Sequence, residues 1–265
     1  PVTMRLQVIG GGQMGEALVG GLVASGWAAA GEIHVVEPDG DRRIELESSV
    51  PGLTCGVEPL SGTDALIAVK PHIVASVCAA LNAVGVGRVL SIAAGVRLDT
   101  LEEGLGTGAA VVRAMPNTPS LVGEGAAAIA AGTSVGDEDL RWASEILSSV
   151  GTVVVVDEPM LDAVTGLSGS GPAYLFLLAE ALIDAGVAQG LPHGTATALT
   201  EQMLIGAATL LRKSDAVPSV LRRNVTSKGG TTAAGIAVFE AADFSGLVAA
   251  VVSAASERSR ELGGT

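Results

Sequence analysis

The sequence predicts a two-part α/β protein, in which a doubly wound parallel sheet over residues 1–157 precedes an all-helical region over residues 158–265. Three observations lead to this prediction. Short β-rich runs alternate with helical patterns in the first part, a glycine-rich turn directly follows the first β-rich run, and strand patterns end before Asp157. Strands that alternate with helices are typical of a parallel sheet covered by helices.

The first part is expected to hold six strands, with helical segments between most of them. The first helix is expected over Met14–Ser25, directly after the glycine turn, and the next over Arg42–Glu47. The predicted strands are Leu6–Ile9, Ile33–Val36, Ala65–Val69, Arg88–Ile92, Ala110–Arg113 and Val153–Val156.

The second part is expected to contain five helices, separated by Gly, Pro and Ser. They span Tyr174–Val187, His193–Arg212, Val217–Asn224, Thr231–Ala242 and Ser245–Leu262. The first of them is apolar almost all round, and a helix of that kind needs cover that a small five-helix unit does not supply. We therefore expect this region to form a subunit interface.

Composition limits the classes of function. The net charge of −13 argues against an extended nucleic-acid surface. The uncharged stretch Ala163–Ala179 contains glycines and Pro172, so it is interpreted as a loop entering a helix and not as a membrane span. Cys55 and Cys78 form no metal-spaced cluster or disulfide framework. A cytoplasmic protein without metal, membrane or nucleic-acid partner is expected.

The glycine-rich turn follows a predicted strand and precedes a predicted helix, which is the context of a dinucleotide fingerprint. In the pattern GxGxxG, the first glycine makes the tight turn, the second lets the backbone approach pyrophosphate, and the third lets the helix pack on the strand. The alternative is a plain strand-to-helix turn. The residues expected to contact a dinucleotide here are Gly10, Gly11, Gly12, Gln13, Met14 and Gly15.

The end of the second strand carries conflicting signals about the coenzyme. Glu37 lies where an acid commonly binds the ribose 2′-hydroxyl and favours NAD. Arg42 and Arg43 follow within a helical turn or so and could instead hold the 2′-phosphate of NADP. All three are also consistent with solvated charges at a helix start, so the sequence leaves NADH and NADPH open.

Two further strand ends are expected to reach the same crevice, because ligands of open sheets bind beyond the carboxyl ends of the strands. Small residues there would let a flat nicotinamide ring approach the backbone. The residues concerned are Ala68, Val69, Lys70 and Pro71 after one strand, and Ser91, Ile92, Ala93 and Ala94 after the other.

A hydroxyl-rich loop, VTSKGGTT over residues 225–232, precedes a predicted helix. The first turn of a helix has unpaired N–H groups and a positive dipole end, which together suit a small carboxylate. The alternative is an ordinary glycine-rich helix cap. Together with the dinucleotide turn, this loop indicates a reductase.

The ordered motifs GGGQMG, AVKP, SIAAGV, RAMPNTP, SGSGPAY, GLP, VTSKGGTT and RSREL resemble pyrroline-5-carboxylate reductase from about Leu6 to Leu262. SGSGPAY with VTSKGGTT at this spacing is the most specific part. The resemblance implies reduction of 1-pyrroline-5-carboxylate to L-proline with NADPH or NADH, a Rossmann domain at residues 1–157, and a helical dimerisation and substrate domain at 158–265. It also implies a homodimer, often assembled into a decamer, with the active site formed between the coenzyme domain and helices of the dimer.

Site roles follow from the same resemblance. Thr232 matches the threonine whose hydroxyl bonds the ring nitrogen of the substrate, and Asn117 matches a residue near the nicotinamide. Two positions depart from the family pattern: Lys228 replaces a common proline, and Glu37 replaces small polar or basic residues. The residues that match the substrate loop are Ser227, Gly230, Thr231 and Thr232.

Two other functions fit parts of the pattern. A Rossmann reductase of the 3-hydroxyacid dehydrogenase type would need a lysine base, and neither Lys213 nor Lys228 lies in a motif of that kind. A non-catalytic NAD(P)-binding protein would leave the 225–232 loop without a role. Hydride transfer to a protonated imine requires no histidine base, so the three histidines are not expected to be catalytic.

Overall fold

The structure is a computed structural model that describes residues 3–106 and 108–264. It has two compact units. One runs to Ser170 and includes the segment from Ser253 onward, and the other is Gly171–Val252. These units are defined by how the chain packs and not by function. The predicted boundary at residue 157, between a coenzyme domain and a dimerisation domain, therefore stays a prediction.

The first unit is built on one eight-stranded sheet, in the order β3-β2-β1-β4-β5-β6-β7-β8. Every neighbouring pair is parallel except β6 and β7, which are antiparallel. The strands are β1 (Leu6–Ile9), β2 (Ile33–Val36), β3 (Thr54–Gly56), β4 (Ala65–Ile67), β5 (Arg88–Ser91), β6 (Ala110–Met115), β7 (Gly125–Ala131) and β8 (Gly151–Val155).

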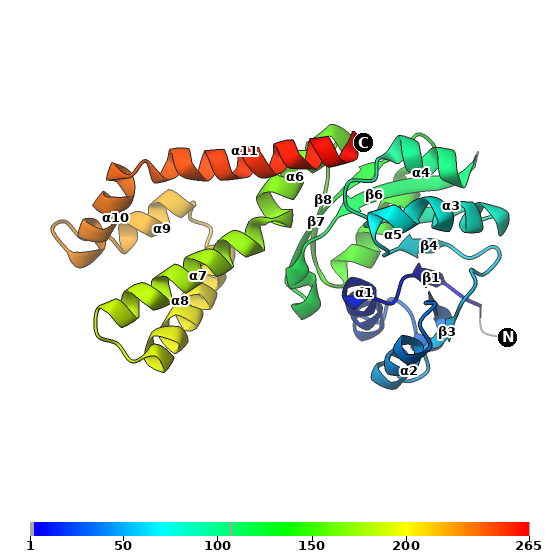
Figure 1. Cartoon of the computed structure of the whole chain (residues 1–265), viewed down its shortest axis with the longest axis horizontal. Helices are drawn as coiled ribbons and strands as arrows, with labels where there is room; N and C mark the ends of the chain where they lie inside the picture. Colours follow the sequence, from blue (N-terminus) through cyan, green and yellow to red (C-terminus); the bar gives the residue numbers. More distant parts are fainter. Residues whose placement is uncertain (1–2, 107, 265) are drawn as a thin grey trace. The chain divides into compact units, whose positions relative to one another are not determined.

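Helices cover both faces of the sheet (Figure 1). Strand residues alternate between the faces, so Leu6 and Val8 of β1 join one core while Ile9 joins the other. The first core is closed by α1 (Gln13–Ala24), α2 (Gly40–Ser49) and α5 (Asp137–Ser148). The second is closed by α3 (Val74–Ala83), α4 (Leu98–Leu105) and α6 (Leu161–Val164).

Short 3₁₀ segments link several elements: η1 (Ala30–Glu32), η2 (Pro71–Ile73), η3 (Thr118–Val122) and η4 (Glu158–Met160). The glycine turn lies at the carboxyl end of β1, between β2 and β4 in the sheet. In the doubly wound fold this is the edge at which ligands bind.

The structure corrects three details of the sequence prediction. Strands β3 and β7 were not predicted, and β7 breaks the expected all-parallel order. The segment Thr165–Gly169 is a π-helix, η5, and not a loop. Serines that indicated a loop instead form helical bonds: the Ser168 hydroxyl donates to the Val164 carbonyl at 3.2 Å, and the Ser170 N–H donates to the Thr165 carbonyl at 2.8 Å.

All regular elements among the described residues of the second unit are helices. Its helices are α7 (Gly171–Ala188), α8 (His193–Lys213), α9 (Pro218–Asn224), α10 (Thr231–Ala241) and the first part of α11 (Phe244–Gly263). Helices α7 and α8 pack against each other, as Figure 1 shows. The predicted bounds of these helices were right to within about three residues.

Large apolar side chains of the second unit are exposed in the single chain. Phe176 is 64 % exposed, Leu177 67 % and Val238 71 %. By length and composition the helical run Glu158–Ala188 could also cross a membrane, with a mean hydropathy of 1.4, and α10 with α11 pass the same test as a pair bent by 55°. Clustered exposed apolar side chains of this kind mark an interface with another protein or with lipid.

Candidate active site

The glycine turn is shaped by close backbone contacts that exclude side chains. Gly10 has a φ of +106°, and a Cβ at this position would lie 2.6 Å from the carbonyl oxygen of Ala68. A Cβ at Gly15 would lie 2.2 Å from the carbonyl oxygen of Gly10. Both positions therefore require glycine, the first for the turn and the second for the contact between α1 and β1.

Gly12 differs from the other two glycines, because a Cβ there would meet no atom within 4 Å. It is exposed, and as the N-cap residue of α1 it has no side chain to cap the helix. The open space beside Gly12 thus lies at the positive end of the helix dipole, where the first-turn amides have no partner within the helix. A pyrophosphate fits this position, since it needs backbone donors and close approach without a side chain.

A groove of about 520 Å³ adjoins this turn. It brings together three of the predicted strand ends, because β1, β2 and β4 are neighbours in the sheet. Gly11 is buried beside it and donates its N–H to Glu37 Oε2 at 2.9 Å. Predicted site residues that line the groove are Gly10, Gly12, Glu37, Ala68, Val69, Lys70.

A second groove of about 870 Å³ lies beyond β5 and is lined by Pro71 and Ala94 among others. Ser91 and Ala93 are almost fully buried, at 0 % and 3 % exposure, so neither offers an exposed side chain to a ligand. Ile92 is half-buried and packs against the first core. Of the four residues predicted at the end of this strand, only Ala94 lines this groove.

In the second unit, the loop before α10 has a shape that depends on two glycines. Gly229 has a φ of +72°. A Cβ on Gly230 would lie 2.4 Å from Ser227 Oγ, so the serine hydroxyl occupies the space above that glycine. Thr231 and Thr232 begin α10 and are exposed, and no side chain caps this helix. Hydroxyls and first-turn amides are thus gathered at one helix start, which suits a small anion.

Comparison with known proteins shows similarity along the whole chain. Residues 158–262 match the family model for pyrroline-5-carboxylate reductase dimerisation, and residues 5–95 match the model for NADP oxidoreductase, coenzyme F420-dependent. The chain is 44 % identical to the pyrroline-5-carboxylate reductase of Synechocystis over 99 % of both chains. It is 41 % identical to that of Pseudomonas aeruginosa over 98 % of this chain and 97 % of the relative.

The chain belongs to the pyrroline-5-carboxylate reductase family.

Solved structures agree with this assignment. The pyrroline-5-carboxylate reductase of Coxiella burnetii superposes with a TM-score of 0.94 at 36 % identity, covering 99 % of this chain and 100 % of that one. The enzyme of Plasmodium falciparum with NADP bound superposes with a TM-score of 0.83 at 31 % identity, covering 99 % of both chains. The helical region and its exposed apolar side chains are thus those of a reductase family whose dimerisation model covers residues 158–262.

Asn117 holds together parts of the reductase fold that are distant in sequence. Its Nδ2 donates to the Ser168 carbonyl at 3.0 Å, and its Oδ1 accepts from the Ala126 N–H at 2.8 Å. The side chain is 9 % exposed. Its amide is thus used within the protein, joining the end of β6 to the π-helix and to β7.

The π-helix that replaces the predicted loop carries the first two residues of the SGSG motif, Ser168 and Gly169. A Cβ on Gly169 would lie 2.7 Å from Met115 Cε, so this glycine lets the π-helix approach the end of β6. π-Helical turns are rare and often occur at functional sites. Thr165 of this segment and Ser170, its C-cap residue, line the second groove.

Sequence analysis missed an ion pair made by Arg113, the first residue of the RAMPNTP motif. Arg113 in β6 is 7 % exposed, and its Nη1 lies 2.8 Å from Glu158 Oε1. The same oxygen accepts the N–H of Leu98, the first residue of α4, at 2.7 Å. An arginine inside the apolar strand AVVRAM could have signalled a buried partner, since a buried charge needs one.

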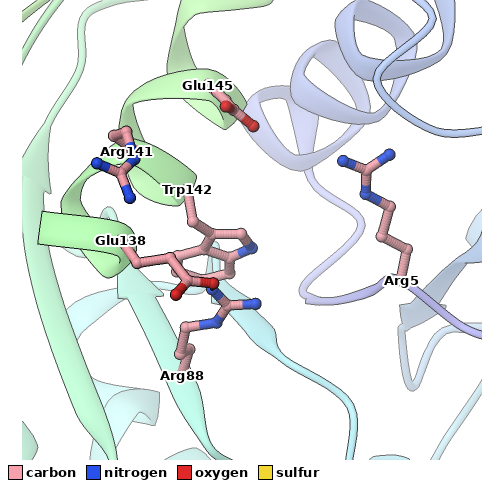
Figure 2. Close-up of a pocket in the computed structure, with 6 residues that line it drawn as sticks. All are labelled: Arg5, Arg88, Glu138, Arg141, Trp142 and Glu145. Carbon is pink, nitrogen blue, oxygen red and sulfur yellow. The ribbon is translucent and has the colours of Figure 1, made fainter. Parts of the chain in front are cut away.

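Another pocket, of about 240 Å³, lies at the amino ends of the strands, opposite the glycine turn. Arg5 immediately precedes β1, and Arg88 begins β5, so both lie at the amino ends of strands. Figure 2 shows Arg88 beneath the ring of Trp142, with its guanidinium carbon 5.1 Å from the ring centroid. Arg88 also pairs with Asp64 at 2.6 Å. None of the predicted site residues lines this pocket, whose lining is Arg5, Arg88, Glu138, Arg141, Trp142 and Glu145.

Proposed function

We propose that this chain reduces 1-pyrroline-5-carboxylate to L-proline with NAD(P)H, as the last step of proline biosynthesis. The observation that carries the proposal is the match to pyrroline-5-carboxylate reductases over 99 % of the chain at 44 % identity. The open glycine turn and the hydroxyl-rich start of α10 support it. A hydroxyacid dehydrogenase or a purely regulatory protein accounts for the turn but not for this loop.

The first unit would hold the coenzyme. The first-turn amides of α1 beside Gly12 would bind the pyrophosphate, and Lys70 at the end of β4 would add a positive charge in the same groove. When bound, the nicotinamide supplies a hydride. The remaining coenzyme contacts are proposed for Gly10, Gly11, Gln13, Met14, Gly15, Glu37, Ala68, Val69, Pro71, Ser91, Ile92, Ala93, Ala94 and Asn117.

The start of α10 would hold the substrate. Amides of the first turn and the Ser227 hydroxyl suit its carboxylate, with Gly230 and Thr231 shaping that site. The carbon of a protonated C=N bond is already electrophilic, so it accepts the hydride while the nitrogen keeps the proton. The Thr232 hydroxyl would bond this nitrogen and orient it. The residues thus act chiefly by alignment and by hydrogen bonding.

Residues 158–265 would also serve as the dimerisation domain. The exposed apolar side chains of α7, Phe176 and Leu177 among them, need a partner surface. We infer that a second copy of the chain covers them, which accounts for the apolar run Glu158–Ala188 without a membrane. A homodimer is the minimal unit, a decamer is the larger assembly of such dimers, and the cytoplasm is the location. Light scattering that found a monomer at micromolar concentration would contradict this inference.

The function is tested by following nicotinamide absorbance with the purified protein, 1-pyrroline-5-carboxylate, and either NADH or NADPH. We expect rapid oxidation of coenzyme with proline as the product. A protein that binds coenzyme but oxidises neither one with this substrate would not be a pyrroline-5-carboxylate reductase.

A further inference from the structure

Glu37 is fixed beside the glycine turn, at the carboxyl end of β2. Its Oε2 accepts the N–H of Gly11 at 2.9 Å, and its Oε1 accepts the N–H of Asp39 at 3.0 Å. Its own N–H donates to the Gly56 carbonyl at 2.9 Å, which extends the pairing of β2 with β3. A carboxylate has about four acceptor positions, so two backbone bonds leave room for two hydroxyl donors. In a Rossmann fold this is the position of the adenosine ribose.

Arg42 is the nearest candidate for a 2′-phosphate, and the structure shows that it is engaged elsewhere. Its Nε donates to the Gly11 carbonyl at 2.7 Å. Its Nη2 pairs with Glu16 at 2.5 Å and its Nη1 with Glu45 at 2.9 Å. Two carboxylates thus neutralise this guanidinium, and its three kinds of nitrogen all have acceptors. Binding a phosphate would require at least one of these bonds to break.

Arg43 is also held by the protein. Its Nη1 donates to the Glu37 carbonyl at 2.7 Å and to the Pro38 carbonyl at 2.9 Å. The guanidinium thus braces the loop that carries Glu37. A phosphate that drew Nη1 away would break both bonds and release this loop.

The other charged residues of the groove separate a negative ribose side from a positive pyrophosphate side. Glu58 lines the groove just after β3, which neighbours β2, and so adds a second carboxylate on this side. Lys70 follows β4, which is two strands away from β2 with β1 between them. Two strand spacings amount to about 10 Å. The lysine therefore lies on the pyrophosphate side of the groove and the carboxylates on the ribose side.

We propose that Glu37 makes this chain select NADH over NADPH, by accepting the hydroxyls of the adenosine ribose and repelling a 2′-phosphate. The proposal deepens the reductase function and rests on the coenzyme groove assigned there. A phosphate ester at the 2′ position would bring up to two negative charges against a carboxylate whose side chain forms no ion pair with an arginine of the described residues. The selectivity is a property of this chain's own residues, while the Plasmodium falciparum relative was solved with NADP.

The test measures binding apart from turnover. Fluorescence titration of the purified protein with NADH and with NADPH should give a dissociation constant at least about tenfold lower for NADH. Glu37→Gln removes the charge but keeps an acceptor oxygen for the turn, and it should bring the two constants to within about threefold of each other. The same shift is expected in the ratio of kcat/KM values.

Glu58→Gln is the matched control, since it removes a carboxylate from the same groove and should shift the ratio by less than about threefold. Tighter binding of NADPH by the unaltered protein, or an unchanged ratio in a folded Glu37→Gln protein, would overturn the proposal. Selective NADH binding without reduction of 1-pyrroline-5-carboxylate would leave this proposal standing and overturn the proposed function instead.

Discussion

Glu158 Oε1 lies 2.8 Å from Arg113 Nη1 and also accepts the N–H of Leu98, so one carboxylate oxygen ties β6 to the start of α4. The side chains of Arg113 and Glu158 are 8 % and 19 % exposed. A buried ion pair adds little to stability compared with apolar residues of the same volume. Removing one partner, however, leaves the other charge buried and unpaired.

We therefore expect Glu158→Gln to lower the free energy of unfolding by about 3 kcal/mol. Urea denaturation at fixed protein concentration measures this change, because the stability of an oligomer depends on concentration. The matched control is Glu261→Gln, which removes the partner of Arg258 in a pair whose side chains are 63 % and 65 % exposed. An exposed pair of this kind contributes less than about 1 kcal/mol. Equal losses in the two variants would show that burial of Arg113 does not matter.

Gly12→Ala separates coenzyme binding from folding. No atom lies within 4 Å of the added Cβ, so the variant should fold with unchanged stability. The methyl group would nevertheless occupy the space through which the pyrophosphate approaches the backbone. We expect coenzyme affinity to fall by at least about tenfold, since one displaced contact of about 1.4 kcal/mol has that effect.

The control for Gly12→Ala is Gly20→Ala, because Gly20 lies within α1 and a Cβ there also meets no atom within 4 Å. This change should stabilise the helix by about 0.5 to 1 kcal/mol and leave coenzyme binding unaltered. If both variants bind coenzyme as the unaltered protein does, the pyrophosphate does not approach at Gly12.

Regular elements of the chain could be predicted because their patterns are local. Strands Leu6–Ile9 and Ile33–Val36 have the predicted bounds, since apolar runs flanked by turn residues leave little choice. Strand β7 could not be found this way, because its sequence GAAAIAA is rich in alanine, the best helix former. Pairing with β6 and β8 decides its conformation, and that pairing is not visible in seven residues.

The coenzyme turn was also predictable, since glycine spacing reflects backbone contacts that the structure shows at Gly10 and Gly15. The ion pairing of Arg42 could not be predicted, because its partner Glu16 is 26 residues away in sequence and lies on another helix. The burial of Ser91 could not be predicted either, because the sequence shows only that this residue ends a strand. Side-chain networks between distant elements are what sequence patterns leave undetermined.

Gly230→Ala tests the substrate loop through packing. The new methyl group would lie 2.4 Å from Ser227 Oγ, so the serine hydroxyl must move. We expect kcat/KM for 1-pyrroline-5-carboxylate to fall by at least about tenfold while coenzyme affinity is unchanged, as for a lost hydrogen bond of about 1.5 kcal/mol to a charged group. Gly235→Ala is the control, since it lies in α10 with no atom within 4 Å of its Cβ and should keep full activity.

Thr232→Ala tests the hydroxyl assigned to the ring nitrogen. If this hydroxyl stabilises the changing charge on the nitrogen, its loss should lower kcat by about 10²-fold, as for removal of one polar stabiliser. Thr232→Ser keeps the hydroxyl and should recover most of the rate. Steady-state kinetics at saturating coenzyme measure both variants, and unchanged kcat in Thr232→Ala would remove this residue from the mechanism.

His34 should make stability depend on pH. It is 9 % exposed in β2, with Nδ1 2.9 Å from Thr54 Oγ1, and burial lowers the pKa of its imidazole below the usual 6.5. As the pH falls below 6.5, the unfolded chain binds the proton before the folded chain does. The contribution of neutral His34 is thus complete above the unfolded pKa and is lost as the pH falls through the folded pKa. Comparing unfolding free energies at about pH 7.5 and about pH 5.5 spans the start of this window.

The His34→Gln variant should lose the part of the pH dependence that comes from this imidazole, so its stability relative to the unaltered protein should improve as the pH falls. Substituting the exposed His72 by Gln provides the control for the loss of a histidine as such. The difference between variants isolates one histidine, because carboxylates that titrate at lower pH contribute equally to all three proteins. A parallel pH dependence in His34→Gln and the unaltered protein would show that His34 takes up a proton equally well in the folded and unfolded chains.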